Sequence, residues 1–143
     1  MAGKCKPTIE IKRYQVKIEH IAIWVNDLEK MRSFYETYFM AVSGEKYYNP
    51  TKKFSSYFLS LEEGSRLELM HKPEINFRFE SEMMSTGLVH FAISVGSKVN
   101  VDTLTNRLRA DGYTIAGEPR TTGDGYYESV VEDPEGNQIE ITI

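Results

Sequence analysis

The chain alternates between short apolar runs and amphipathic stretches, and this pattern occurs twice. Apolar, partly β-branched runs over residues 16–25 and 88–95 predict two buried strands. Each run is followed by a stretch with apolar residues at helical spacing, which predicts a helix. These residues are Leu28, Met31, Phe34, Tyr35 and Tyr38 after the first run, and Val101, Leu104 and Leu108 after the second.

Polar residues and a glycine mark the ends of the two predicted helices. Asn26 or Asp27 can cap the first helix at its N-terminus, and Asn100 can cap the second. Gly112 follows the last apolar position of the second helix, where a glycine commonly ends a helix. The sequence therefore predicts one helix in each half of the chain.

Three short strands are predicted after each helix, so each half has the element order βαβββ. In the first half they are 42–48, 54–61 and 65–70, and in the second half they are 113–120, 125–131 and 137–142. This order predicts an α+β fold. We expect one domain over residues 16–143, built from modules 16–70 and 87–143. Residues 71–86 are the expected linker, and residues 1–15 are an N-terminal tail.

The two halves also repeat each other in sequence. The segment HIAIWV at 20–25 matches HFAISV at 90–95, seventy residues later. EGSRLEL at 63–69 matches EGNQIEI at 135–141, seventy-two residues later. The repeat therefore places a histidine in both first strands and a glutamate in both last strands.

These four repeated residues form a set of metal ligands: His20, Glu68, His90 and Glu140. Two imidazoles and two carboxylates suit a borderline divalent ion and leave room for water or substrate oxygens. Zinc, nickel, cobalt, iron and manganese ions all suit this set of ligands. Taken singly, such a histidine is more often a hydrogen-bonded core residue, and such a glutamate faces solvent. Their joint recurrence favours the metal site, and Ala22 and Ala92 leave space beside the imidazoles.

Composition narrows the class of protein and of ligand. Among 143 residues, 41% are hydrophobic and 27% are charged, as in globular domains. The net charge of −4, without a basic block, argues against nucleic acid as a partner, and no apolar run is long enough to span a membrane. Cys5 is the only cysteine, which excludes an internal disulfide. The N-terminus lacks the apolar segment of a signal peptide, so we expect a cytoplasmic protein with a small-molecule substrate.

Other chemistry-bearing residues have simpler interpretations. His71 has no counterpart in the repeat and is expected to be a solvated loop histidine. Residues 120–125 form a glycine-containing loop that either holds a substrate anion or turns the chain. Several tyrosines are candidates for lining a pocket, although strand aromatics usually serve packing. They are Tyr47, Tyr48, Tyr57, Tyr126 and Tyr127.

These motifs resemble the vicinal oxygen chelate superfamily, which includes glyoxalase I, fosfomycin and bleomycin resistance proteins and extradiol dioxygenases. The resemblance covers about residues 16–143. It rests on the two histidine strands, on LEL at 67–69 and on DPEGNQIE at 133–140. It implies a glyoxalase-like fold, in which paired βαβββ modules form curved mixed sheets around a metal. It also implies a small-molecule substrate that chelates the metal, and a homodimer.

Within the superfamily, the ligand set is similar to that of bacterial glyoxalase I. His20, Glu68, His90 and Glu140 resemble its nickel or cobalt type, whereas extradiol dioxygenases and fosfomycin enzymes do not use the position of Glu68. The resemblance implies nickel, cobalt or zinc, with iron or manganese as alternatives. It also implies a lyase that transfers a proton on a hemithioacetal or related α-oxo substrate through an enediolate. Glu140 or Glu68 is then the catalytic base.

Two positions depart from the glutathione-using glyoxalases that the chain resembles. Trp24 stands where those enzymes have an arginine, and Lys72 stands where they have an asparagine. We therefore expect weak or absent turnover of the glutathione hemithioacetal. Two other functions stay open at this point: a drug-binding resistance protein of the bleomycin or fosfomycin type, and an extradiol-type dioxygenase.

Overall fold

The computed structural model describes residues 16–76 and 86–143, and these form two units of the same kind. The N-terminal unit consists of β1 (His20–Trp24), α1 (Leu28–Phe39), β2 (Val42–Ser43), β3 (Tyr47–Asn49), β4 (Phe54–Ser60) and β5 (Arg66–His71). The C-terminal unit consists of β6 (His90–Ser94), α2 (Lys98–Ala110), β7 (Ile115–Thr121), β8 (Tyr127–Glu132) and β9 (Gln138–Thr142). The predicted tail and most of the predicted linker lie outside the described residues.

Each unit forms its own mixed sheet. The strand order is β1-β5-β4-β2 in the N-terminal unit, where β3 also pairs with β4, and β6-β9-β8-β7 in the C-terminal unit. The first strand of each unit runs parallel to the last, and the other neighbours are antiparallel. The predicted α+β fold is confirmed. The predicted strand 42–48 is two short strands, because the register of pairing with β4 changes between Ser43 and Tyr47.

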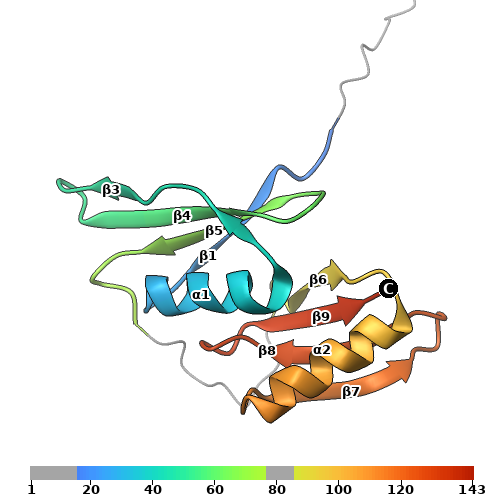
Figure 1. The fold of residues 1–143 in the computed structure, drawn as a ribbon. Coiled ribbons are helices and arrows are strands. Elements are labelled where there is room, and N and C mark those ends of the chain that lie inside the picture. Colours follow the sequence, from blue (N-terminus) through green and yellow to red (C-terminus); the bar gives the residue numbers. More distant parts are fainter. Residues whose placement is uncertain (1–15, 77–85) are drawn as a thin grey trace, which may run out of the picture.

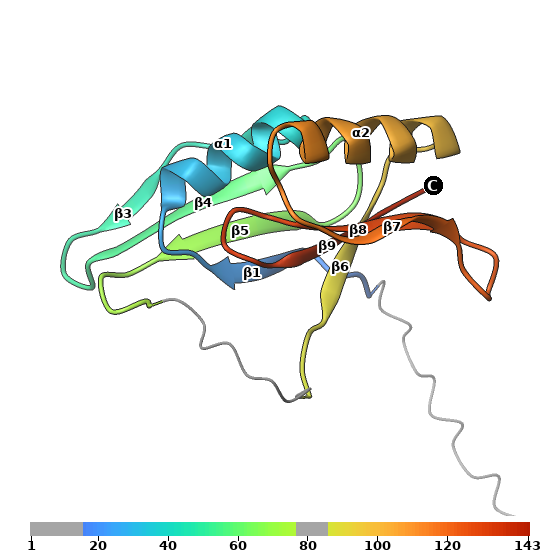
Figure 2. The ribbon, with the colours of Figure 1, turned by 90° about the horizontal axis from the view of Figure 1, so that it is seen from below.

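Both helices lie on the same side of the molecule. α1 covers one face of the N-terminal sheet, and α2 covers one face of the C-terminal sheet (Figure 1). In Figure 2, the two helices lie along one side and the strands along the other. The face of each sheet opposite its helix, called here the open face, therefore points the same way in both units. Strand residues alternate between the open face and the core.

The core lies between each helix and its sheet. Buried core residues of α1 include Leu28, Met31 and Phe34, as the spacing predicts. In α2, Thr105 is fully buried in the core, whereas Leu104, which the spacing predicts to be a core residue, is only partly buried. The Thr105 hydroxyl lies 2.6 Å from the Val101 carbonyl oxygen and 2.7 Å from the hydroxyl of Ser129 on β8. A buried hydroxyl is tolerated there because it has hydrogen-bond partners.

The helix ends agree with the sequence at α1 and differ at α2. Asp27 caps α1, and its side chain accepts a hydrogen bond from the Lys30 backbone N–H. The predicted cap Asn100 is wrong: α2 begins one turn earlier, and Ser97 caps it. The Asn100 side chain instead donates to the Val95 carbonyl (2.7 Å). In the described part of the chain, neither helix has the length and apolar run needed to cross a membrane.

Contacts from α1 and the residues just before it join the two units. The hydroxyl of Tyr35 donates to the buried carboxylate of Asp133 (2.8 Å), in the turn between β8 and β9. In the same turn, the carboxylate of Glu135 accepts hydrogen bonds from the backbone N–H groups of Asn26 and Asp27. Charge-assisted hydrogen bonds of this kind are stronger than neutral ones. They hold the turn of the C-terminal unit against the helix of the N-terminal unit.

Candidate functional site

His20 and Glu68 lie together on the open face of the N-terminal sheet. β1 and β5 are adjacent parallel strands in which Ala22 pairs with Glu68, so His20, Ala22 and Glu68 share a face. Nε2 of His20 lies 3.6 Å from Oε2 of Glu68. The edge of the Phe58 ring on β4 packs against the imidazole, with ring centroids 5.3 Å apart.

The C-terminal sheet repeats this arrangement. Ala92 on β6 pairs with Glu140 on β9. Nε2 of His90 lies 3.2 Å from Oε2 of Glu140. Each open face therefore presents one imidazole nitrogen and one carboxylate oxygen at equivalent positions.

The structure brings the four predicted ligands together as two pairs and not as one group of four. The pairs belong to separate sheets. Across residues 16–76 and 86–143, no three His, Cys, Asp or Glu side chains lie close enough to hold one metal ion. The two histidine side chains are 38% and 39% exposed, so both remain accessible on the open faces.

Glu19 orients one of the two imidazoles. Its carboxylate lies 2.5 Å from Nδ1 of His20 and also accepts from the guanidinium of Arg66. These hydrogen bonds, the one from His20 first, hold the pKa of Glu19 below its usual value. An ionised carboxylate only accepts, so Nδ1 of His20 is the donor in this contact and Nε2 faces Glu68. In the C-terminal unit the equivalent residue is Val89, which has no such group.

Sequence reasoning missed Glu128, a carboxylate beside Glu140. Glu128 lies on β8, is only 8% exposed and shares the open face with Glu140. Burial raises the pKa of Glu128, and the neighbouring carboxylate of Glu140 raises it further. Nη2 of Arg120 lies 3.6 Å from Glu128 and offsets part of this effect. The sequence offered only a weak signal for it, since β8 also contains the polar residues Ser129 and Glu132.

The remaining candidates have mostly structural roles. His71 is not a loop residue, because it ends β5 and its Nδ1 contacts the Val25 carbonyl oxygen (2.9 Å). Tyr57 and Tyr127 point to the helix sides of their sheets, where their hydroxyls contact Glu29 and Asp102. Tyr48 and Tyr126 are exposed, and Tyr47 lines a small recess. The loop at 120–125 is the turn between β7 and β8.

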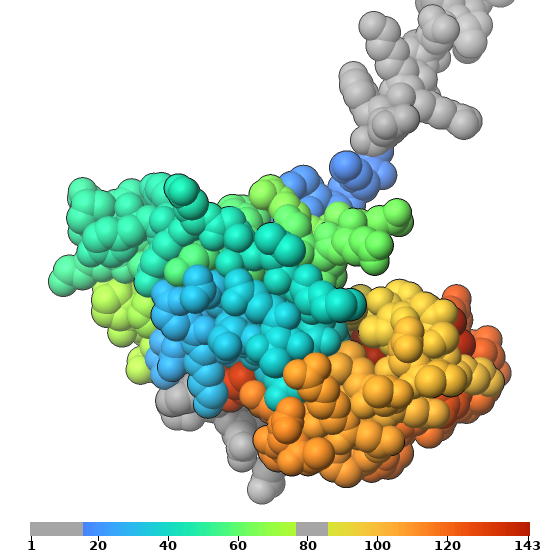
Figure 3. Space-filling model, viewed as in Figure 1, coloured from blue at the N-terminus to red at the C-terminus, as the bar shows by residue number. Residues whose placement is uncertain are grey.

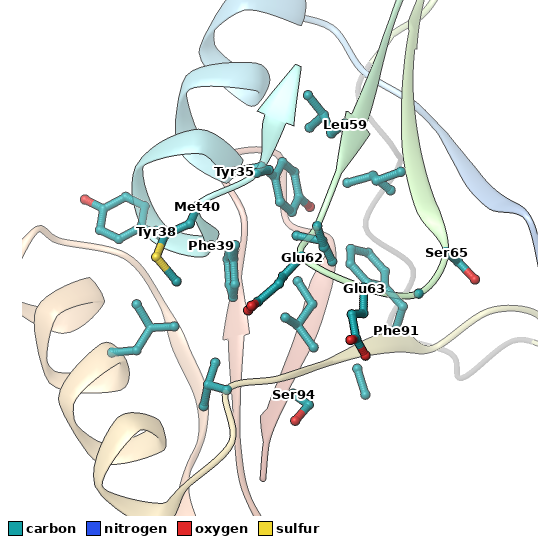
Figure 4. Close-up of a pocket in the computed structure, with 18 of the residues that line it drawn as sticks. Tyr35, Tyr38, Phe39, Met40, Leu59, Glu62, Glu63, Ser65, Phe91 and Ser94 are labelled. Carbon is teal, nitrogen blue, oxygen red and sulfur yellow. The ribbon is translucent and has the colours of Figure 1, made fainter. Parts of the chain in front are cut away.

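A larger groove of about 1180 Å³ separates the two units. It lies between the C-terminal end of α1, the β4–β5 turn, β6 and α2, and Figure 3 shows the recess beside the end of α1. In Figure 4, Tyr35, Phe39 and Leu59 line its upper part, while Phe91 and Ser94 of β6 lie below them. Both histidine strands contribute to the groove, since Ile21 of β1 and most of β6 line it.

Comparison with known proteins places the chain in a family. Residues 17–141 match the family model described as Glyoxalase/Bleomycin resistance protein/Dioxygenase superfamily. A Bacillus subtilis (strain 168) protein, the uncharacterized YqjT, is 32% identical over 127 residues, which span 87% of this chain and 96% of YqjT.

Solved structures share the fold. Glyoxalase I from Zea mays has a TM-score of 0.73 at 23% identity, and the match covers 88% of this chain but only 44% of the maize chain. The trypanothione-dependent glyoxalase I of Leishmania major has a TM-score of 0.72 at 24% identity, covering 90% of this chain and 86% of that one. A glyoxylase/bleomycin resistance protein/dioxygenase domain from Frankia sp. EAN1pec has a TM-score of 0.77 at 18% identity, covering 91% and 98%. The chain therefore belongs to the glyoxalase/bleomycin resistance protein/dioxygenase superfamily.

Proposed function

We propose that this protein is a metal-dependent lyase of the glyoxalase I type, which transfers a proton on a hemithioacetal or related α-oxo substrate. The observation that carries this proposal is the duplicated His–Glu pair, with Nε2 and Oε2 close together on both open faces. Superfamily members often bind divalent metals and small-molecule substrates. The donor set fits nickel, cobalt or zinc, and also iron or manganese.

A second copy of the chain completes the site in this proposal. Within the described residues, β1 and β6 each lie at the edge of their sheet, and both border the groove between the units. An edge strand carries unpaired backbone groups that can bond to another strand. When β1 of one copy lies beside β6 of the other, two open faces join, and His20 and Glu68 meet the second copy's His90 and Glu140. A symmetric dimer then has two equivalent sites.

The chemistry needs a positive charge and a base. The four side chains would hold a divalent ion, which would supply Lewis-acid stabilisation of negative charge on a carbonyl oxygen. A carboxylate takes the proton from the carbon beside that carbonyl and returns it to the neighbouring carbon. We assign this role first to Glu140, as the resemblance to glyoxalase I favours, and next to Glu68, which occupies the equivalent position. Burial keeps water from the Glu128 carboxyl next to Glu140.

Mixing two inactive variants tests the shared site. His20→Ala and His90→Ala are each expected to lack metal and activity as homodimers. After equal amounts are unfolded and refolded together, about a quarter of the wild-type metal sites and activity return. Half of the dimers are then mixed, and each mixed dimer has one intact site of two. If the mixture stays inactive although mixed dimers form, the site does not lie between two copies.

The substrate is tested with the nickel, cobalt and zinc forms against hemithioacetals of several thiols. We expect turnover with at least one thiol, and weak or absent turnover with glutathione, because Trp24 and Lys72 replace the residues expected for that thiol. Absence of turnover with every thiol contradicts the glyoxalase assignment. Oxygen consumption with a catechol would support a dioxygenase instead.

A further inference from the structure

A second, smaller recess lies on the same open face as His20. It has a volume of about 290 Å³ and is lined by Trp24, Tyr47, Asn49, Lys52, Phe54 and Lys72. Trp24 is the fourth residue after His20 on β1, so the two side chains share the open face and lie about 13 Å apart along the strand. On β1, only the small Ala22 lies between them on that face. We call this site the aromatic recess.

Three aromatic rings form the walls of the aromatic recess. Trp24 and Phe54 meet edge to face, with centroids 6.2 Å apart, and Phe54 contacts Tyr47 at 6.0 Å. Trp24 is 46% exposed and Tyr47 is 54% exposed. A solvent-facing cluster of large rings leaves apolar surface that a flat ligand can cover.

The charge of the aromatic recess is positive. Lys72 places its ammonium 5.6 Å from the centre of the Trp24 ring, and Lys52 also lines the recess. Within residues 16–76 and 86–143, neither lysine forms an ion pair with a carboxylate, unlike Lys46, which pairs with Glu29. Two uncompensated ammonium groups repel a cationic ligand and attract an anionic one.

The size of the aromatic recess limits what it holds. Pockets for drug-sized ligands usually have volumes of about 300–1,000 Å³. At about 290 Å³, the recess takes one or two fused rings and not a whole large molecule. Its distance from His20 then suits one end of an elongated substrate.

We propose that the aromatic recess binds a flat aromatic carboxylate, and that this group is the distal part of the substrate whose reacting end lies at His20 and Glu68. Because the rings of Trp24 and Phe54 are nearly perpendicular, one of them stacks on a face of the ligand and the other contacts its edge, while Lys72 and Lys52 hold its carboxylate. The link to the reacting end rests on the proposed function, whereas binding of the aromatic anion does not.

Binding of 2-naphthoate to the metal-free protein tests this site. Trp24 is the only tryptophan, so the single indole N–H resonance in a nitrogen-labelled sample reports on the recess directly. We expect 2-naphthoate to shift this resonance saturably. The neutral 2-naphthamide has the same rings and should bind about tenfold more weakly.

Matched lysine variants separate a specific contact from general charge. Lys72→Gln should weaken 2-naphthoate binding about five- to tenfold and leave 2-naphthamide unchanged. Lys30→Gln removes the same charge from an exposed position on α1 and should change neither. Equal affinity for the two probes, an unchanged affinity in Lys72→Gln, or tighter binding of 2-naphthylmethylammonium would overturn the proposal.

The same titration in His20→Ala separates this proposal from the proposed function. The variant should lose metal and still bind 2-naphthoate normally, because the recess is about 13 Å from the imidazole. If the protein binds metal and turns over a hemithioacetal but does not distinguish 2-naphthoate from 2-naphthamide, only the aromatic recess proposal fails. If 2-naphthoate binds as expected and the histidine variants keep their metal, only the proposed function fails.

Discussion

The open faces of the two units carry the same His–Glu pair in very different surroundings. In the N-terminal unit the neighbours are aromatic or cationic: Phe58 packs on His20, and the guanidinium of Arg66 lies 4.1 Å from the centre of the Phe58 ring. The corresponding residues of the C-terminal unit are Val130 and Gln138. Trp24 likewise corresponds to Ser94.

The acidic groups are distributed in the opposite way around Glu68 and Glu140. The buried Glu128 stands beside Glu140, while its equivalent near Glu68 is Ser56. Outside the pair, Glu19 contacts His20, while Val89 precedes His90. The two units therefore keep the same His–Glu pair, whereas the residues around the pair differ between them. We therefore expect both units to contribute similarly to metal binding, and differently to substrate binding and proton transfer.

The largest expected effect tests the equivalence of the two pairs. His20→Ala and His90→Ala should each reduce metal affinity by at least about 100-fold, because the four-ligand set has no spare protein ligand. Metal content after dialysis against a competing chelator measures this loss. His71→Ala is the control. Because His71 contacts a backbone carbonyl on the helix side, this variant should keep its metal. A large loss in only one of the two ligand variants would contradict the equivalence.

The second effect tests the difference between the two carboxylates. Glu140→Gln keeps the size and one oxygen donor but removes basicity, so the single-turnover rate should fall by about 10² or more while metal affinity falls modestly. Glu68→Gln should reduce the rate less. Metal content and rate are measured on the same samples. Full rates in both variants with metal bound would mean that neither carboxylate is the base.

A smaller effect is expected from the residue that orients His20. Glu19→Gln removes the charge that fixes the imidazole tautomer, and loss of such a partner typically lowers metal affinity by about tenfold or more. Glu45→Gln removes the same charge from an exposed position near the end of β2 and serves as the control. Equal metal affinities in the two variants would show that Glu19 does not support the site.

The smallest effect concerns the contact that joins the units. Burial raises the pKa of Asp133 above its usual value, although its hydrogen bonds act against this rise. The folded protein therefore binds the Asp133 proton more tightly than the unfolded chain, and the contribution of Asp133 to the free energy of unfolding falls as the pH rises above about 4. The fall is about 1.4 kcal/mol for each pH unit between the two pKa values.

Comparison with Asp133→Asn isolates this contribution from the other carboxylates. The variant is less stable at every pH, because an amide has only one oxygen acceptor. Oδ2 of Asp133 accepts from the Tyr35 hydroxyl and the Asn137 side chain, and Oδ1 accepts from the backbone N–H groups of Glu135 and Asn137. The stability advantage of the unmodified protein should shrink as the pH rises from about 4 until it passes the raised pKa of Asp133. Denaturant unfolding at several pH values measures the difference, and an advantage that grows with pH would contradict the assigned direction.

The sequence by itself determined the repeated βαβββ order and the equivalent positions of the two His–Glu pairs. Both follow from local periodicity and from the repeat, since a strand alternates every two residues and a helix returns about every 3.6. The cap at Asp27 could also be predicted from the sequence, because a cap acts on backbone groups within three residues.

Only the tertiary structure decided which distant segments meet. It placed Glu128 beside Glu140 through the register of β8 and β9, and it joined Tyr35 to Asp133 across 98 residues. It also placed the two histidine strands at sheet edges that border a groove, so that the two His–Glu pairs lie on separate sheets. Periodicity specifies which face a side chain takes, but strand order and register depend on the packing of whole elements, and no local pattern encodes them.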